Sequence, residues 1–391
     1  MKKIILKHKK DAAVRRFHPW IFSGAIFRKE EGIEEGDWVE VYSGKEELLA
    51  TGHYHHNSIA IRVLSFGEVR DQQAFWNTKI KSAYDYRQQL QLVDNEQTNC
   101  YRLIHAEGDG LPGLIVDVYG ETTVVQCHSI GMHRDLKQIV TALKNCYGDQ
   151  LKAIYNKSID TLPKDYASTT ANGYVFGEST VSVVQENGHS FLINWETGQK
   201  TGFFLDQRAN RQLLTQYVKD KKVLNAFCYS GGFSIYALQA GAKQVDSVDI
   251  SAKAIELTDK NVALNGNQEQ QHRSFAEDVM QFLKTSEEYE VMVVDPPAFA
   301  KNIKKRHAAV QGYKRLNVLA LKKIAPKGIL FTFSCSQVVG KQLFEDTITA
   351  AALEAGRSIR IMHYLSQAAD HPVNLFHPES SYLKGLVLQV E

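Results

Sequence analysis

The amino-acid sequence predicts a multidomain α/β protein, because three regions of the chain have different patterns. Residues 1–74 contain short, alternating, β-branched segments, residues 75–189 mix helix and strand patterns, and residues 190–391 alternate strands with helices. The first pattern is typical of a small β-barrel or sandwich, and the third is typical of a doubly wound, mostly parallel sheet. A chain of 391 residues has room for two or three domains at roughly 150 residues per domain.

The first region is predicted to be β-rich, since "DWVEVYS", "ELLATGHY" and "SIAIRVLSF" alternate in polarity and are separated by glycines. The segment "GHYHHN" supplies His53, His55 and His56, which could suggest a metal site. However, no cysteine or further histidine lies at a ligand-like spacing. A strand edge or a turn is therefore the favoured interpretation, and no metal site is predicted.

The second region is predicted to be a small α+β domain. "DQQAFWNTKIKSAYDYRQQL" has the apolar spacing of a helix, and "HRDLKQIVTALKNCYG" reads as an amphipathic helix that ends at Gly148. Between them, "GDGLPGLIVDVYGETTVVQCHS" predicts two strands joined by a turn at Gly120, which is a β-hairpin. This region carries no obvious chemistry of its own and is expected to link the other two.

Composition bounds the class of protein. No apolar run approaches the roughly 18 residues that a membrane span needs, and the basic start lacks the apolar core of a secretion signal. The five cysteines are odd in number and form no C-x-x-C pair, which is typical of a reducing cytoplasm. We therefore expect a cytoplasmic protein without a membrane partner.

Net charge is only +2, but its distribution is uneven. Residues 1–30 contain nine lysines and arginines against two acids, Asp11 and Glu30. Such a basic face could bind phosphates, as in nucleic-acid-binding proteins, or could be an ordinary solvated surface. Charge alone leaves both interpretations open.

The third region is predicted to form a seven-stranded sheet. Its first five strands are "KVLNAFC", "QVDSVDIS", "QHRSFAED", "YEVMVVDPP" and "GILFTFSCS", and "RSIRIMHYL" and "SYLKGLVLQV" are the closing two. The helices between them are expected at "GFSIYALQAG", "AKAIELTDKNVALNG", "DVMQFLKTS" and "QGYKRLNVLALKKIA". In such sheets ligands bind beyond the carboxyl ends of the strands, near the first strand.

A cofactor site is predicted at that edge. The first strand leads into Gly231 and Gly232, which allow close approach of the backbone to a ligand, but the G-x-G-x-x-G of dinucleotide enzymes is absent. Asn225 lies on this strand, Asp249 ends the second strand where it could hold a ribose, and Asp278 ends the third near an adenine edge. Helix capping explains each acid singly but not the set, so the pattern favours S-adenosyl-L-methionine (AdoMet).

The fourth strand ends in "VVDPPAFAKN", which fixes a carboxylate at the same edge. Pro296 and Pro297 stiffen the turn after Asp295 and remove two N–H donors. In amino-group methylases an aromatic residue directly follows the D-P-P or N-P-P triplet, whereas here Ala298 precedes Phe299. Methylation of an exocyclic amine is therefore less favoured.

The fifth strand ends at Cys335, which is either a small buried residue or a nucleophile. Neighbouring parallel strands should place Cys335 beside Asp295. Attack of a thiolate on carbon 6 of cytosine makes carbon 5 reactive toward a sulfonium methyl group, which suits this pair. Cys228, next to the cofactor loop, is the competing thiol. A basic run follows Asp295 in the sequence and comprises Lys301, Lys304, Lys305 and Arg306. These side chains could contact RNA and help to ionise the thiol, or they could belong to a solvated loop.

The chain resembles the RlmI type of bacterial large-subunit ribosomal RNA cytosine-5 methyltransferases. The motifs that carry the resemblance span the chain: "RRFHPWIFSGAI", "YRLIHAEGDGLPGLIVDVYG", "KTGFFLDQR", "NAFCYSGGFS", "SVDIS", "VVDPPAFAKN", "FTFSCS" and "QAADHPV". The resemblance implies an RNA-binding PUA domain over residues 1–74, a linking domain over 75–189, and a Rossmann-like class I AdoMet-dependent methyltransferase over 190–391. It also implies ribosomal RNA as partner and 5-methylcytosine as product.

The resemblance implies roles for individual residues. Cys335 corresponds to the nucleophile, and "FFLDQR", with Phe203, Phe204 and Asp206, to a segment that closes over cofactor or target. The implied cofactor and base pocket comprises Asn225, Ala226, Phe227, Tyr229, Ser230, Gly231, Gly232, Asp249, Ile250, Asp278, Asp295 and Pro296. The implied RNA contacts are Gln207, Arg208, Pro297, Phe299, Lys301, Lys304, Lys305, Arg306, Arg15, Arg16 and Trp20.

One departure leaves the mechanism open. Most RNA cytosine-5 methylases carry a second cysteine beside the fourth-strand prolines, where this chain has Ala298. The group that removes the carbon 5 proton and releases Cys335 is therefore not identified. Related guanine methylases share D-P-P-x-F, so methylation of guanine or adenine is an alternative activity. A non-catalytic RNA-binding assembly factor is the alternative from another class of protein. The sequence also leaves open which nucleotide is modified and whether the chain forms a homodimer.

Overall fold

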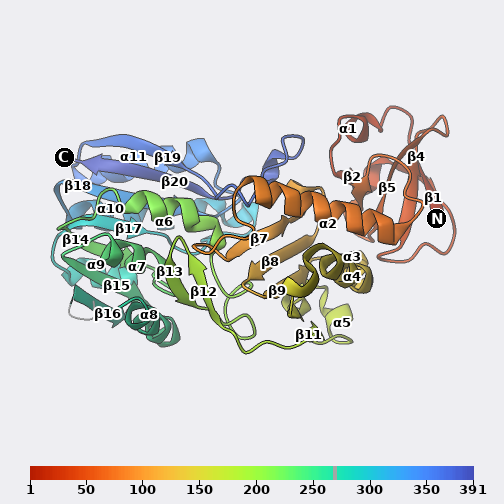
Figure 1. Cartoon of the computed structure of the whole chain (residues 1–391). Coiled ribbons are helices and arrows are strands. Elements are labelled where there is room, and N and C mark those ends of the chain that lie inside the picture. The colour runs from red at the N-terminus through yellow and green to blue at the C-terminus, as the bar shows by residue number, and fades with distance from the viewer. Residues whose placement is uncertain (267–270) are drawn as a thin grey trace. The chain divides into compact units, whose positions relative to one another are not determined.

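The computed structural model describes residues 1–266 and 271–391, which form two compact units (Figure 1). The first unit comprises Met1–Val184, Ile193–Leu205 and Ala369–Ser380, and the second comprises Gln185–Leu192, Asp206–Ala368 and Ser381–Glu391. The chain therefore passes between the units several times. Within residues 1–266 and 271–391, none of the helices combines the length and apolar character that crossing a membrane requires.

The first unit begins with a six-stranded sheet of order β2-β6-β5-β4-β1-β3. Its elements are β1 (Lys2–Leu6), α1 (Ala12–Arg15), β2 (Trp20–Phe22), η1 (Ser23–Ala25), β3 (Ile26–Lys29), β4 (Trp38–Tyr42), β5 (Leu48–Tyr54) and β6 (Ile59–Ser65). The three predicted strands are confirmed as β4, β5 and β6. Alternate residues such as Ile4, Leu6, Val39 and Val41 are fully buried and form the core of this sheet.

The histidines of "GHYHHN" are part of this packing. His53, in β5, is fully buried, and its Nε2 lies 3.0 Å from the Asp135 carboxylate. The Nδ1 of His55 lies 2.9 Å from the Glu35 carboxylate. The two side chains therefore have structural partners, which agrees with the strand-edge interpretation.

The first unit continues with a five-stranded sheet of order β11-β10-β9-β8-β7. Its elements are α2 (Gln72–Gln89), β7 (Cys100–His105), η2 (Ala106–Asp109), β8 (Leu114–Tyr119), β9 (Thr122–Cys127), α3 (Ile130–Arg134), α4 (Leu136–Tyr147), η3 (Gly148–Gln150), β10 (Ala153–Asn156), η4 (Ile159–Thr161), α5 (Lys164–Ala167) and β11 (Gly173–Phe176). The predicted hairpin is confirmed: β8 pairs antiparallel with β9, and Gly120 turns with φ +59°. Both predicted helices are also present, as α2 and α4.

A buried ion pair ties distant segments into the first unit. Arg102 donates from Nε and an Nη to the two oxygens of Asp117, at 2.7 and 2.8 Å. Thr201 Oγ1 donates to the same carboxylate at 2.5 Å, and Asp370 accepts the backbone N–H of Arg102 at 3.0 Å. Breaking a buried pair by removing one partner is strongly destabilising, so this network explains why segments from two later parts of the chain belong to this unit.

The second unit contains the predicted seven-stranded sheet, of order β16-β15-β14-β17-β18-β20-β19. Its strands are β14 (Lys222–Ala226), β15 (Gln244–Asp249), β16 (His272–Ala276), β17 (Tyr289–Val294), β18 (Ile324–Ser334), β19 (Ile359–Leu365) and β20 (Lys384–Val390). The first five run parallel, and β20 is antiparallel to both neighbours. The mostly parallel sheet is therefore confirmed. A separate two-stranded sheet joins β12 (Val183–Glu186) to β13 (His189–Leu192).

Helices cover both faces of this sheet. They are α6 (Arg208–Leu214, after η5 at Leu205–Gln207), α7 (Gly232–Gln239), α8 (Ala252–Leu264), α9 (Val279–Thr285), α10 (Arg306–Lys323, after η7 at Ile303–Lys305) and α11 (Lys341–Ala355), with η8 (Pro378–Ser380) in the first unit. Side chains alternate along β18: Thr332 Oγ1 donates to Asn317 of α10 at 2.7 Å, whereas the Phe333 ring lies 5.9 Å from Phe233 of α7.

Three helices of this unit, α6, α10 and α11, differ from the sequence prediction, which did not include α6. Helix α10 begins at Arg306 rather than at Gln311, so part of the basic run is helical. Helix α11 was not predicted, although its helix-forming residues and the left-handed Gly356 at its end (φ +67°) are helix signals. Its buried residues Phe344, Ile348 and Ala351 pack into the same core cluster as α10.

Candidate active site

The carboxyl ends of four parallel strands meet at one edge of the second unit's sheet. Strand order reverses at β14, whose neighbours are β15 and β17. In open α/β sheets the crevice at such a reversal is where ligands bind. The segments that follow β14, β15, β17 and β18 carry most of the predicted site residues.

The loop after β14 has an unusual backbone. Phe227, Tyr229 and Gly231 adopt positive φ angles of +62°, +48° and +77°. Bulky residues in this left-handed region are strained, and such strain clusters at ligand sites. A Cβ atom on Gly231 would lie 2.7 Å from Cγ2 of Thr258, so glycine is required there for space as well as for conformation.

Neighbouring elements hold this loop in place. Thr258 Oγ1 donates to the carbonyl of Tyr229 at 2.9 Å, and Asn261 Nδ2 donates to the carbonyl of Ser230 at 2.9 Å; both come from α8. Asp249, at the end of β15, accepts the backbone N–H of Tyr229 at 3.1 Å. The predicted ribose-binding carboxylate therefore also fixes the loop beside it.

The other predicted cofactor residues occupy different positions around the loop. Asn225 is buried and donates from Nδ2 to Ser234 Oγ at 2.8 Å. Asp278 is exposed and caps α9 by accepting the N–H of Gln281 at 3.0 Å. Ile250 is 73% exposed and follows Asp249 directly. Ala226, Ser230 and Gly232 are buried, as is Pro296.

These features fit an adenosyl group. The backbone at Gly231 and Gly232 carries no side chain that would block approach, the carboxylate of Asp249 can accept from hydroxyl groups, and the exposed Ile250 offers an apolar surface next to it. An adenine contact of Asp278 stays a prediction, since its carboxylate already caps a helix.

Asp295, after β17, is oriented by the segment that precedes α6. Gln207 Nε2 donates to Asp295 Oδ2 at 2.8 Å, and Asn210 Nδ2 in turn donates to Gln207 Oε1 at 2.6 Å. Within the same unit, Tyr382 Oη donates to Asp206 at 2.5 Å. Two residues of the "FFLDQR" motif thus lie in hydrogen-bond networks of the candidate site.

Arg208, the next residue of that motif, is buried. Its Nε lies 3.4 Å from the Glu186 carboxylate, which Arg211 also binds through two hydrogen bonds of 2.8 Å. This ion pair gives Arg208 a structural partner, so its predicted RNA contact stays a prediction.

The turn after β18 places a thiol beside the carbonyl of Pro296, the residue that follows Asp295. Ser334 and Ser336 are fully buried, and the Ser336 hydroxyl lies 3.0 Å from Tyr313 Oη. Cys335, between them, is half-buried, and its Sγ lies 3.9 Å from the carbonyl oxygen of Pro296. The two hydroxyls therefore face the core, while the thiol stays at the edge, as the sequence predicted.

A lysine that the sequence analysis missed lies beside this thiol. Lys384 begins β20, where it is paired with Ser334, and its Nζ donates to the carbonyls of Ser336 and Tyr382 at 2.8 and 2.7 Å. Burial lowers the pKa of Lys384 to about 8, against an opposing effect of Cys335. A lone lysine in the apolar "YLKGLVLQV" was the available signal.

The other cysteines have the surroundings of inert thiols. Cys100, Cys127 and Cys228 are buried. Burial raises the pKa of Cys127 and of Cys228 to about 12, and that of the half-buried Cys146 to about 11. Thiols with raised pKa values are poor nucleophiles at neutral pH, which disfavours Cys228 as the competing thiol; the role of Cys335 stays a prediction.

The basic run follows the prolines and is exposed. Lys301, Lys304, Lys305 and Arg306 all have exposed side chains, in η7, the residues before it and the first residue of α10. Pro297 is exposed as well. Phe299 instead packs with its ring centroid 4.5 Å from that of Tyr313, so a stacking role on RNA stays a prediction for it.

The RNA-binding residues predicted near the start lie in the first unit. Arg15 forms ion pairs with Asp11 and Glu47, whereas Arg16 is exposed. Trp20 is partly buried, and its Nε1 donates to Glu107 at 2.9 Å. Their contacts with RNA stay predictions.

Comparison with known proteins identifies the family. Residues 4–66 match the model of a PUA-like domain, and residues 108–376 match that of an S-adenosylmethionine-dependent methyltransferase. A protein of Aeromonas salmonicida named ribosomal RNA large subunit methyltransferase I is 38% identical over 393 residues, covering 98% of each chain. One of the same name from Pseudoalteromonas atlantica is 38% identical over 395 residues, covering 99% of each.

Solved structures share the fold over the whole chain. A protein of Streptococcus mutans assigned as a SAM-dependent methyltransferase matches with a TM-score of 0.84 at 21% identity, and covers 100% of each chain. A structure of an assigned methyltransferase in complex with SAH matches with a TM-score of 0.85 at 21% identity, also over 100% of each. The relatives named ribosomal RNA large subunit methyltransferase I match this chain over almost its full length. The chain therefore belongs to the S-adenosylmethionine-dependent methyltransferases and carries a PUA-like domain.

Proposed function

We propose that this chain transfers the methyl group of AdoMet to carbon 5 of a cytosine in large-subunit ribosomal RNA, with Cys335 as a covalent nucleophile. The observation that carries the proposal is the position of Cys335, with its Sγ 3.9 Å from the Pro296 carbonyl and a half-buried lysine anchored on the next residue. The names of the relatives support ribosomal RNA as the substrate class.

The proposed reaction begins at the thiol. The Cys335 thiolate forms a bond to carbon 6 of the cytosine, and the electrons of the 5,6 double bond become available at carbon 5. When bound, AdoMet supplies an electrophilic methyl group, which becomes bonded to carbon 5 as S-adenosylhomocysteine leaves. Asp295, held by Gln207, hydrogen-bonds the polar edge of the base and orients it.

Lys384 helps to form and to release the thiolate. Its amine accepts the thiol proton, and the resulting ammonium stabilises the thiolate both before attack and as the carbon 6–sulfur bond breaks. Burial lowers the pKa of Lys384 to about 8, which makes its neutral amine more accessible near neutral pH than that of an exposed lysine. Since Ala298 stands where related enzymes have a second thiol, water at this half-exposed edge is the acceptor for the carbon 5 proton in the proposal.

Exposed positive charge supports an RNA substrate. The basic run after β17 has side chains free to reach phosphates, and the first unit carries a PUA-like domain with the exposed Arg16. The proposal also places the enzyme in the cytoplasm, together with ribosomal RNA.

The test is methylation in vitro with isotopically labelled AdoMet. The substrate is ribosomal RNA from cells that lack the gene, offered both as naked RNA and as assembled subunits, and the nucleosides are analysed by mass spectrometry. Labelled 5-methylcytidine is expected. Labelled methylguanosine or methyladenosine would contradict the base assignment, and absence of AdoMet binding by calorimetry would instead favour a non-catalytic assembly factor.

A further inference from the structure

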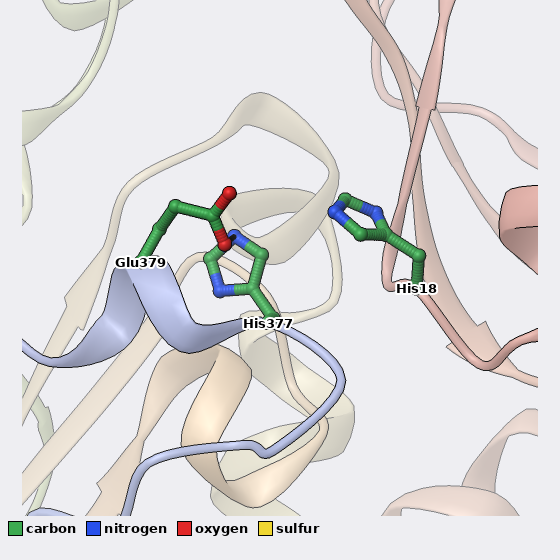
Figure 2. A group of neighbouring side chains, drawn as sticks. All are labelled: His18, His377 and Glu379. Atoms are coloured by element: carbon green, nitrogen blue, oxygen red, sulfur yellow. Dashed lines mark ion pairs between the residues drawn. The ribbon is translucent and has the colours of Figure 1, made fainter.

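Three potential metal ligands converge in the first unit, and none of them is among the residues proposed for methyl transfer. They are His18, between α1 and β2, His377, directly before η8, and Glu379, in η8. Figure 2 shows the three side chains pointing toward one another from two segments of chain. One ligand atom from each residue can be chosen so that all lie within 4.8 Å of one another.

His377 is an unusual buried side chain. It is only 2% exposed, and neither of its ring nitrogens has a hydrogen-bond partner within the part of the chain that the structure describes. Its Nε2 lies 3.7 Å from Oε2 of Glu379, too far for a hydrogen bond. Buried polar atoms are almost always satisfied, so an unsatisfied imidazole indicates a partner that the protein chain does not supply.

The backbone of Trp20 holds the His18 ring through its Nδ1. That nitrogen lies 3.1 Å from the carbonyl oxygen of Trp20 and 3.1 Å from its backbone N–H, so it can donate to the first or accept from the second. Histidines that bind metals through Nε2 characteristically donate the other N–H to a backbone carbonyl, which fixes both the tautomer and the ring plane. In the tautomer that donates from Nδ1 to the Trp20 carbonyl, the Nε2 lone pair of His18 is available to a cation.

The turn that carries the other two ligands is also fixed. The His377 N–H donates to the Asn374 carbonyl at 2.8 Å, and Ser380 Oγ donates to the His377 carbonyl at 2.8 Å. Asn374 Nδ2 donates to the carbonyl of Glu107 at 3.2 Å, which anchors the turn on η2. The side chain of Glu379, in contrast, is 62% exposed and can rotate toward a bound ion.

We propose that His18, His377 and Glu379 bind one divalent transition-metal ion, with Zn²⁺ the best candidate. Two imidazoles and a carboxylate are nitrogen and oxygen ligands that suit Zn²⁺, which takes three protein ligands plus water in open sites. Ligand atoms about 2 Å from an ion lie roughly 3.4 Å from each other, whereas here they lie within 4.8 Å of one another. Rotation of the exposed Glu379 carboxylate would bring its oxygen closer to the two imidazoles. The ion would fasten the 374–380 turn to the segment before β2, within the same unit.

The experiment uses the full-length chain, stripped of metal with a chelator and titrated with Zn²⁺ by calorimetry. Wild type is expected to bind one more equivalent of Zn²⁺ than either His377→Gln or Glu379→Gln. Where a variant still binds this equivalent, its affinity is expected to be about 10-fold or more weaker. His8→Gln and Glu31→Gln are matched controls, because both side chains are exposed in the same unit and lie outside the cluster. AdoMet binding, measured on every variant, shows that the chain remains folded.

Substitution by Co²⁺ gives a second readout. Visible absorption bands of low-symmetry cobalt are expected in wild type and in both controls, and are expected to disappear in His377→Gln and Glu379→Gln. Zn²⁺ binding of equal stoichiometry and affinity in wild type and His377→Gln would overturn the proposal, because His53, the cysteines or other groups would then account for it. Absence of Zn²⁺ binding to folded wild type would overturn it as well.

Discussion

The loop after β14 and the basic run after β17 lie in the same unit, but the protein holds them very differently. The loop contains three left-handed residues, and it is held at Tyr229 and Ser230: Asp249 accepts the N–H of Tyr229, and Thr258 and Asn261 donate to the carbonyls of Tyr229 and Ser230. In the basic run, the four charged side chains are exposed, and within the described chain no ion pair or side-chain hydrogen bond holds them. The cofactor side is thus preorganised, whereas the substrate side is free to adapt to a polyanion.

The difference follows from the ligands that each side meets. A small cofactor makes few contacts, so the protein groups that bind it must be in position before the cofactor arrives. The left-handed backbone of the loop is the strain that this preorganisation requires. A long RNA offers many phosphates, and its attraction to mobile lysines depends little on exact geometry. Cys335 lies beside the proline turn that precedes the basic run, with its Sγ 3.9 Å from the Pro296 carbonyl oxygen. The account therefore predicts separable effects of substitutions on chemistry, cofactor binding and RNA binding.

The largest effect is expected from Cys335→Ala. If the thiol is the nucleophile, methyl transfer falls by about 10³-fold or more, while affinity for AdoMet and for RNA is unchanged. Single-turnover methylation together with calorimetry measures both quantities. Cys228→Ala is the matched control, and retention of normal activity in Cys335→Ala would remove the thiol from the mechanism.

The second effect tests the rigid side. Gly231→Val forces a branched side chain into φ +77° and toward Thr258 at 2.7 Å, so we expect AdoMet affinity to fall by about 100-fold. RNA affinity should stay the same. Gly340→Ala is the control, because a Cβ there meets no atom within 4 Å. Equal AdoMet affinities for the two variants would show that the loop is not preorganised for the cofactor.

The third effect concerns Lys384, whose removal as Lys384→Met should lower the rate by about 10²-fold. The active form has a thiolate and an ammonium, so the wild-type rate should rise with pH as the thiol ionises. It should fall again as the ammonium, with its pKa lowered to about 8, loses its proton. The measurement is the pH dependence of single-turnover methylation.

In Lys384→Met the falling limb of that profile should vanish, and the rising limb should move to higher pH. Lys341→Met is the matched control, since Lys341 lines the same cleft as Lys384 but its ammonium lies over the Tyr364 ring. A Lys384→Met profile with the wild-type shape would reduce the lysine to a structural role.

The smallest effect tests the adaptable side. Lys304→Gln combined with Lys305→Gln should weaken RNA binding severalfold and reduce the slope of log affinity against log salt by about 1.5, with AdoMet affinity unchanged. Lys243 and Lys327, exposed at the other ends of the strands, supply the control pair. An unchanged salt slope would remove the basic run from the RNA-binding surface.

The sequence predicted the sheet of the second unit because its strands are apolar runs that end in Asp249, Asp295 and Cys335. Those strand ends are local signals, and parallel pairing then brings them to one edge. Helix α11 was missed although Phe344, Ile348 and Ala351 recur at helical spacing and a glycine ends it, because the prediction followed the strand ends rather than this connection.

Features that depend on distant pairing could not be predicted. Lys384 reaches the carbonyl of Ser336, next to Cys335, only because β20 inserts antiparallel between β18 and β19, which no local pattern shows. Likewise, His18 meets His377 only because residues 369–380 return to the first unit. The predicted domain boundaries at residues 74 and 189 stay predictions. The two compact units of the structure divide the chain at other points, among them Val184, Ile193 and Leu205.

The central claim is that Cys335 forms a covalent bond to the cytosine ring. Its most direct test is incubation of the enzyme and AdoMet with target RNA that carries 5-fluorocytosine, in which carbon 5 has no proton to lose. The account predicts a stable protein–RNA adduct for wild type and for Cys228→Ala, with the cross-linked peptide mapped to Cys335, and no adduct for Cys335→Ala. An adduct that persists in Cys335→Ala, or one mapped to another residue, would contradict it.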